Sequence, residues 1–178
     1  VATDQAVRDL SDWGADVVKV GIGQGSPCTT KDKTGFTMPM FSCTQKCSGL
    51  YSGDFVEASE KKIPIIADGG IKCNGDIAKA IVAGANMVMA GGLFAACTDS
   101  PAVPSTINDV PHKAYFGSAS AENKGHNNNV EGKLTNISCN NMTYEQKLNE
   151  ITQDLQSSVS YAGGNNLESL QNVDYNLV

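Results

Sequence analysis

The chain has 178 residues, a formal net charge of −6 and an ordinary apolar share of 40%. This length predicts one domain, residues 1–178, with a sizeable core. An acidic surface repels phosphate backbones and anionic lipids, which argues against nucleic acid or a membrane as partner. We find no apolar run long enough to span a membrane, no signal peptide and no disulfide framework in the six cysteines, so we expect a cytoplasmic protein.

Helical and strand patterns alternate over the first half of the chain. Apolar residues recur at helical spacing in some stretches, and β-branched runs typical of buried strands lie between them. The expected elements are helix 4–13, strand 17–22, an interrupted helix 41–61, strand 63–67, helix 76–82 with its cap near Asn74, and strand 87–90. This alternation predicts parallel strands joined by right-handed crossovers. Three strands are too few to close a barrel of eight, so we expect the chain to be part of a larger fold.

Residues 99–140 have a different composition, with three prolines, three consecutive asparagines and few apolar residues. Long loops in compact enzymes are commonly lids or binding loops, so we expect a flap-like excursion with little core of its own. Beyond it, an apolar stripe made of Leu148, Ile151, Leu155 and Val159 predicts a helix over 143–162. A short helix near 166–171 and an extended tail follow.

The first strand leads directly into a loop that carries three glycines and one cysteine. This loop reads Gly21-Ile22-Gly23-Gln24-Gly25-Ser26-Pro27-Cys28-Thr29-Thr30. Glycine permits tight turns and lets a ligand approach the bare backbone. A thiol just beyond the carboxyl end of a parallel strand lies where barrel enzymes hold their catalytic groups. Cys28 is therefore a candidate nucleophile, although a lone cysteine is by default a buried, inert thiol.

Several motifs, in the same order along the chain, resemble those of the inosine monophosphate dehydrogenase / guanosine monophosphate reductase family of (β/α)8 barrels. They lie at residues 23–30, 64–70, 87–93, 115–120, 130–132 and 154–164. The resemblance covers almost the whole chain but corresponds to the C-terminal half of the family's barrel. It implies an α/β fold, namely the C-terminal portion of a (β/α)8 TIM barrel, with the flap 99–140 following the last barrel strand.

Within the family, three features favour the reductase branch: Lys33-Thr34-Gly35, a short stretch without arginine between Ser120 and Val130, and the segments 118–120 and 155–164, which resemble bacterial-type reductases. The resemblance then implies NADPH-dependent reductive deamination of GMP to IMP and ammonia, through a covalent cysteine thioimidate. A thiolate splits this displacement into two easier steps. The implied catalytic residues are Cys28 as the nucleophile, with Thr30 and Glu131 handling the departing ammonia.

The resemblance also implies a nucleotide site on the turns that follow the strands. Its residues are Ser26, Asp68, Gly69, Gly70, Gly91, Gly92, Tyr115, Gly117, Ser118 and Ala119. Asp68 would accept from the ribose hydroxyls, and glycine N–H groups would hold the phosphate. The carbonyls of Gly23, Gly25 and Cys28 match positions that hold a monovalent cation, K⁺, in this family. The residues that bind the nicotinamide cofactor stay unassigned, and the family implies a homo-tetramer.

Alternatives remain open at this point. One is an IMP dehydrogenase that oxidises IMP to XMP with NAD, and another is a catalytically silent half-barrel that binds purine nucleotides. Asp68 could merely cap the following turn, and Glu131 could be a solvated loop charge. Two positions depart from the family's pattern, which usually has glutamine near Met40 and often a basic residue in place of Asn128.

Overall fold

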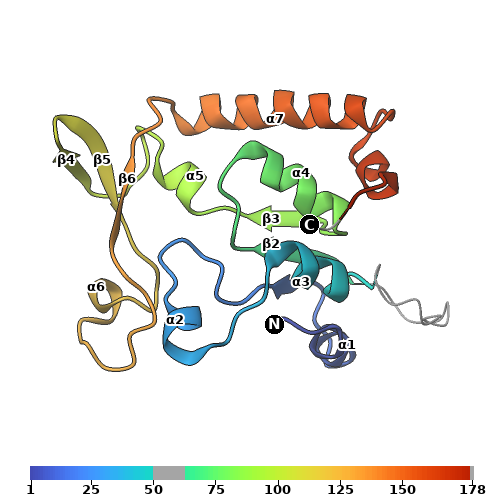
Figure 1. Cartoon of the computed structure of the whole chain (residues 1–178), viewed down its shortest axis with the longest axis horizontal. Coiled ribbons are helices and arrows are strands. Elements are labelled where there is room, and N and C mark those ends of the chain that lie inside the picture. The colour runs from blue at the N-terminus through green and yellow to red at the C-terminus, as the bar shows by residue number, and fades with distance from the viewer. Residues whose placement is uncertain (50–62, 177–178) are drawn as a thin grey trace.

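The first sheet is parallel, with three strands in the order β1-β2-β3 (Figure 1). They are β1 (Val18–Val20), β2 (Ile65–Asp68) and β3 (Met87–Met89). The register places Val20 beside Ala67 and Ala67 beside Val88, so the three carboxyl ends lie at one edge of the sheet. The computed structural model describes residues 1–49 and 63–176, and over these the predicted α/β alternation is confirmed.

Helices cover one face of this sheet. The helices α1 (Asp4–Asp12) and α3 (Met40–Cys47) pack against β1 and β2. Their shared core consists of Val7, Val18, Val20, Cys43, Cys47 and Ile65. Strands alternate their side chains between two faces, so Lys19, Ile66 and Met87, which are aligned across the sheet, lie on the opposite face. That face is more exposed, and Met87 and Met89 retain 47% and 46% of their accessible surface.

Helix α4 (Asn74–Val82) packs on the same face of the sheet, where its Ala80 meets Ala67 of β2. Helix α7 (Tyr144–Tyr161) and the 3₁₀ helix η1 (Leu167–Asn172) pack against α4, and the core between these three elements consists of Ile77, Ile81, Ile151, Val159 and Leu170. The long helix α7 starts where the sequence indicates, because Thr143 and Gln146 form a reciprocal capping box. Its apolar stripe is confirmed at Ile151 and Val159, whereas Leu148 is 39% exposed.

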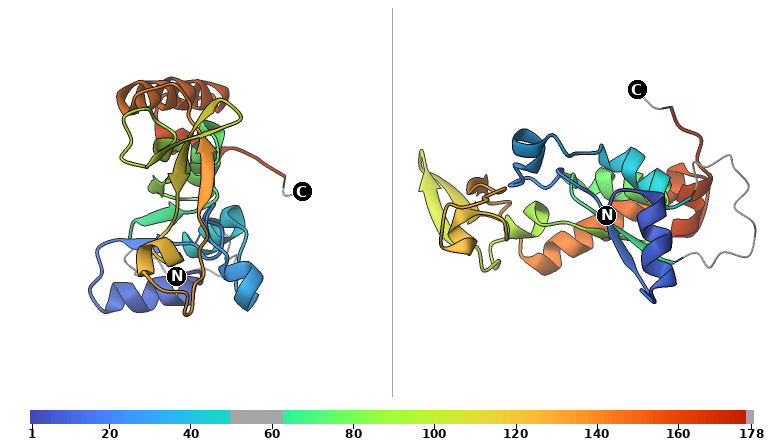
Figure 2. Two further views of the ribbon diagram at one scale, coloured as in Figure 1. Left: turned by 90° about the vertical axis from the view of Figure 1, so that its left-hand side faces the viewer. Right: turned by 90° about the horizontal axis from the view of Figure 1, so that it is seen from below.

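Residues 99–140 contain a second sheet, whose strands the sequence did not predict. Its antiparallel strands are β4 (Pro104–Ile107), β5 (Val110–Tyr115) and β6 (Thr135–Ser138). Asn108 and Asp109 form the β4–β5 turn with φ of 50° and 61°, the left-handed region that short hairpin turns require. We call residues 104–138 the arm; it extends away from the parallel sheet (Figure 2). Within the arm, the buried residues are Lys113 and Ser120.

Three shorter helices, α2 (Thr30–Thr34), α5 (Gly92–Ala95) and α6 (Ala121–Lys124), follow the strand ends or lie in the arm. Helix α4 begins two residues earlier than predicted, and its N-cap is Cys73, because the Asp76 carboxylate accepts from the Lys72 and Cys73 N–H groups. Helix α3 ends at Cys47, and most of the rest of the predicted helix 41–61 lies outside the described residues. Within the described ranges, no helix combines the length and apolar character needed to cross a membrane.

Candidate functional site

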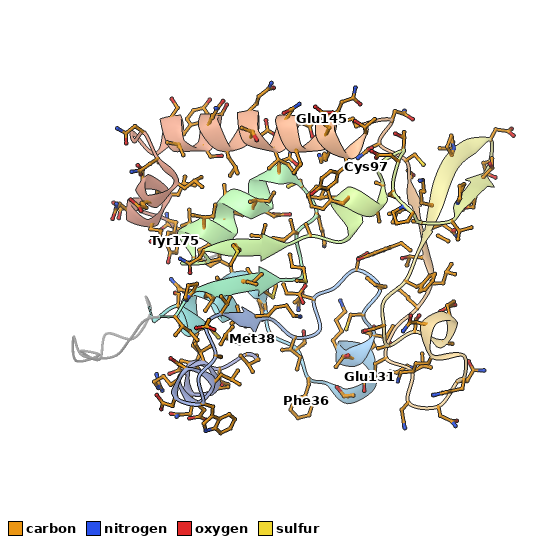
Figure 3. All side chains as sticks on the ribbon, turned by 180° about the vertical axis from the view of Figure 1, so that it is seen from behind. Phe36, Met38, Cys97, Glu131, Glu145 and Tyr175 are labelled. Carbon is orange, nitrogen blue, oxygen red and sulfur yellow. The ribbon has the colours of Figure 1, made fainter. Side chains whose placement is uncertain are left out.

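Three side chains with matching chemistry meet beyond the end of β1. The Cys28 thiol donates to Thr30 Oγ1 at 3.2 Å, and the Thr30 hydroxyl donates to Glu131 Oε2 at 2.7 Å. Cys28 is a partly buried free thiol, and Glu131 lies beside α2 (Figure 3). A single hydroxyl therefore links a nucleophilic sulfur to a carboxylate, which is an arrangement suited to proton transfer next to a reacting carbon.

Local turns place the cysteine and the threonine. The Cys28 N–H donates to the Gly25 carbonyl at 2.9 Å, which closes a turn over Ser26 and Pro27. Thr30 is the first residue of α2, and the hydroxyl of Thr34 donates to its carbonyl at 2.7 Å. The relay hydroxyl is therefore carried by a helical turn rather than by a free loop.

The arm brings Glu131 to this loop through backbone pairing. The Thr29 N–H donates to the Glu131 carbonyl, and the Lys133 N–H donates to the Pro27 carbonyl, both at 2.9 Å. Cys28 and Gly132 form an antiparallel bridge between these two bonds. A Cβ on Gly132 would lie 2.9 Å from the Ser120 N atom, so the close approach of the backbone at Ala119 and Ser120 requires glycine there.

The glycine turn after β2 packs directly on the cysteine loop. The Gly70 N–H donates to the Gln24 carbonyl at 3.0 Å, and a Cβ on Gly69 would lie 3.2 Å from the Gly25 N atom. Gly21, with φ of 137°, lies so close to the Asp68 carbonyl that a Cβ would overlap it. The Met40 side chain fills the space beneath, with its Cγ 3.3 Å from a Cβ built on Gly70.

Asp68 lies on the more exposed face of the parallel sheet, at the end of β2. Its carboxylate forms an ion pair with Lys19, which comes from the neighbouring strand β1. The two side chains are 32% and 52% exposed, so water weakens the attraction and the ion pair contributes little stability. The contact instead restricts the orientation of the Asp68 carboxylate.

Tyr115 joins the end of β5 to the end of β3. Its hydroxyl lies against Gly91, where a Cβ would overlap it. Burial raises the pKa of the Tyr115 phenol, and the negative charge of Asp68 raises it further. The phenol thus stays protonated and can donate a hydrogen bond near the start of α5, where Gly92 lies.

The segment after Tyr115 passes over the cysteine loop. A Cβ on Gly117 would lie 3.7 Å from Pro27 Cγ, and the Ala119 carbonyl accepts from the Glu131 N–H at 3.0 Å. The Ser118 carbonyl accepts from the Asn123 amide at 3.2 Å, while its side chain is exposed. Residues 117–119 therefore lie against the cysteine loop and next to Glu131. They are the residues for which the family resemblance implies contacts to the purine base.

The remaining predicted residues lie in or beside the same loop. Ser26 is exposed, and Gly23 is buried with φ of 76° against Thr37. The Gly25 carbonyl already accepts from Cys28, which leaves one lone pair for a cation. Among residues 1–49 and 63–176, no group of three or more His, Cys, Asp or Glu side chains forms a metal site.

Comparison with known proteins gives the family of this chain. The family model for the "IMP dehydrogenase / GMP reductase domain" matches residues 1–177. The chain belongs to this family. It is 48% identical over 180 residues to a GMP reductase of Oenococcus oeni, covering 100% of this chain and 52% of that protein. It is also 48% identical to the GMP reductases of Mesoplasma florum and Chromobacterium violaceum, over 98% of this chain and 52% of each. The chain thus spans about half the length of these curated relatives.

Two lysines next to the predicted site, Lys19 and Lys33, were not themselves predicted as site residues. Lys19 was missed because it occupies one position of an otherwise apolar strand; a lone charge there was the available signal. Lys33 was noted as part of a family pattern, but its contact was not foreseen. Its ammonium group donates to the Val130 carbonyl and so ties α2 to the residue before Glu131.

Proposed function

We propose that this chain carries the reacting half of a GMP reductase, which converts GMP to IMP and ammonia with NADPH. The observation behind the proposal is the hydrogen-bonded relay from Cys28 through Thr30 to Glu131. Relatives named GMP reductase that match along the whole chain support it. In the proposed fold, the parallel sheet is the C-terminal portion of a (β/α)8 TIM barrel and the arm is its flap.

Cys28 acts first in the proposed reaction. Its thiolate adds to the purine carbon that bears the amino group, forming a carbon–sulfur bond. Thr30 and Glu131 pass a proton to the departing nitrogen, which leaves as ammonia, and the carbon stays bound to Cys28 as a thioimidate. In the second step the same carbon forms a bond to a hydride, which a bound nicotinamide nucleotide would supply. The carbon–sulfur bond then breaks, and its electron pair returns to Cys28 as the product IMP is released.

The strand ends hold the nucleotide in this proposal. Asp68, oriented by Lys19, accepts from the ribose hydroxyls. The N–H groups of Gly70, Gly91 and Gly92 and the Tyr115 hydroxyl receive the phosphate, since barrel enzymes bind phosphate on the loops after their last strands. Ser26 adds a hydroxyl beside them, and Gly69 lets the turn approach the cysteine loop. Gly117, Ser118 and Ala119 line the base.

The proposal includes NADPH and K⁺. The proposed reaction needs a hydride donor beside the nucleophile Cys28 and the proton carriers Thr30 and Glu131, and NADPH fits that role. The residues that bind NADPH stay unassigned. The carbonyls of Gly23, Gly25 and Cys28 remain the proposed ligands of K⁺, because carbonyl oxygen is a ligand type that suits hard cations. As in the family, the proposed assembly is a homo-tetramer.

The test is GMP-dependent oxidation of NADPH by the intact protein that contains this chain and by its Cys28→Ala variant. The proposal predicts turnover in the wild type and none in the variant, whereas oxidation that persists in the variant refutes the assigned nucleophile. A parallel assay with NADH decides the cofactor preference. IMP-dependent reduction of NAD would indicate the dehydrogenase instead, and GMP binding without turnover in either direction would indicate a silent nucleotide-binding half-barrel.

A further inference from the structure

Lys113, at the centre of the arm, is a buried lysine. It is 5% exposed, and its ammonium group donates to the carbonyls of Thr98 at 3.0 Å and Ser100 at 2.8 Å. Among residues 1–49 and 63–176, no carboxylate forms an ion pair with it. Burying an ammonium group is costly unless it is hydrogen-bonded, so these two bonds are what hold Lys113 in place.

The two carbonyls belong to the segment directly after α5, and that segment is itself fixed. The Ser100 hydroxyl donates to the Ala95 carbonyl at 2.7 Å, and the Thr98 N–H donates to the Met142 carbonyl at 2.8 Å. The first bond ties the segment to the end of α5, and the second ties it to the chain entering α7. Lys113 is therefore bonded to a segment whose position is fixed by hydrogen bonds of its own.

Lys113 and Tyr115 are two residues apart on β5, so they project from the same face of the strand. Their separation along the strand is about 6.6 Å, close to the length of about 6 Å expected for the four-residue helix α5. Lys113 contacts the segment after α5, and Tyr115 contacts Gly91 just before α5. One face of β5 thus contacts the residue before this helix and the segment after it.

We propose that Lys113 is a positioning residue: by fixing β5 along α5, it holds the Tyr115 hydroxyl at Gly91, where the nucleotide phosphate binds. This inference rests on the proposed function and deepens it. Lys113 itself touches neither the substrate nor the reacting atoms. Its loss lets β5 shift along α5, so that the phosphate loses one hydrogen-bond donor while Cys28, Thr30 and Glu131 keep their contacts.

The first test compares GMP kinetics of Lys113→Met, which keeps the apolar stem, with those of Tyr115→Phe and the double variant. Each single variant should raise KM for GMP about tenfold, because the loss of one hydrogen bond weakens binding by about that factor. The value of kcat should change less than about threefold. The double variant should be no worse than Tyr115→Phe, because both remove the same interaction. Lys113→Arg keeps the donors and should recover most of the affinity.

Val159→Ala is the matched control, since it removes buried apolar volume between α4, α7 and η1, far from β5. It should lower the melting temperature and leave KM unchanged. A Lys113→Met variant that loses thermal stability but keeps the wild-type KM would overturn the proposal. Full additivity of the Lys113→Met and Tyr115→Phe effects on KM would overturn it as well.

A second test needs no turnover and so separates this inference from the proposed function. Tyrosine labelled with ¹³C at Cζ reports the titration of Tyr115 by NMR, with Tyr115→Phe assigning the signal. The wild-type phenol should titrate above the ordinary range, because burial and the Asp68 charge raise its pKa. In Lys113→Met the pKa should fall toward the ordinary value as the phenol moves into water. An unchanged pKa would overturn the positioning role even if GMP is the substrate.

Discussion

The hydroxyl of Thr30 donates to the carboxylate of Glu131 at 2.7 Å, although 101 positions separate the two residues in sequence. Backbone bonds on both sides of Cys28 support this contact, so the arm and the cysteine loop form one unit. The side-chain relay is therefore held by main-chain pairing rather than by flexible side chains alone. For this reason we expect its members to act together.

Replacing Glu131 with Gln should lower kcat for GMP about 10²–10⁴-fold with little change in KM, because it removes the proton carrier and keeps the shape. Thr30→Ala should have an effect of similar size, and Thr30→Ser, which keeps the hydroxyl, should stay near wild type. Steady-state kinetics of the double variant check the relay, since residues that act as a unit are not additive. Multiplied effects of the two single variants would indicate independent roles.

Gly21→Ala should destabilise the fold by about 2 kcal/mol or more, since its backbone lies in the left-handed region and a Cβ would overlap the Asp68 carbonyl. Gly75→Ala is the control, because a Cβ there would have its nearest neighbour at 3.9 Å, the Cys73 sulfur, and the residue lies in α4. The control should be neutral or slightly stabilising. Urea unfolding measures both, and equal stability of the two variants would contradict the packing described.

Asp76 should contribute to acid sensitivity of the fold. Burial raises its pKa, but the N–H groups of Lys72 and Cys73 act in the opposite direction and, with the Cys73 and Lys79 side chains, hold the pKa below its usual value. A carboxyl whose pKa is lowered by folding stabilises the protein above its unfolded pKa of about 3.9, and this stability is lost as pH falls through the folded pKa. Asp76→Asn should therefore flatten the fall in unfolding free energy below about pH 4. An acid limb identical to that of the wild type would contradict this role.

Local signals predicted the longer helices and the parallel strands, but not the short helices α2, α5 and α6 or any strand of the second sheet. Helix α7 could be predicted because its capping box and its apolar stripe are both encoded within a few residues of each position. Like β5, the strands β4 and β6 were missed; most residues of β4 and β6 are exposed, so these two strands carry little alternation of apolar and polar side chains. Their structure comes from pairing with β5, and the turn at Asn108 and Asp109 was the one local signal.

The site was predictable to a similar degree and for a similar reason. Glycine turns after parallel strands must gather at one edge of a sheet, so the neighbourhood of Cys28 and Gly70 followed from the pattern. The contacts of Thr30 with Glu131 and of Lys19 with Asp68 join distant segments and depend on strand register. Spacing alone does not reveal them, and the first was expected through the family resemblance.

The most direct measurement of the central claim is the rate at which iodoacetamide alkylates Cys28 with and without GMP, read by peptide mass spectrometry. Cys73 is the internal control, because its thiol is exposed and it lies at the N-cap of α4, outside the predicted site residues. We predict that saturating GMP slows alkylation of Cys28 at least about tenfold and leaves Cys73 unchanged. Equal alkylation of Cys28 with and without GMP would contradict the claim that its sulfur faces a bound purine nucleotide.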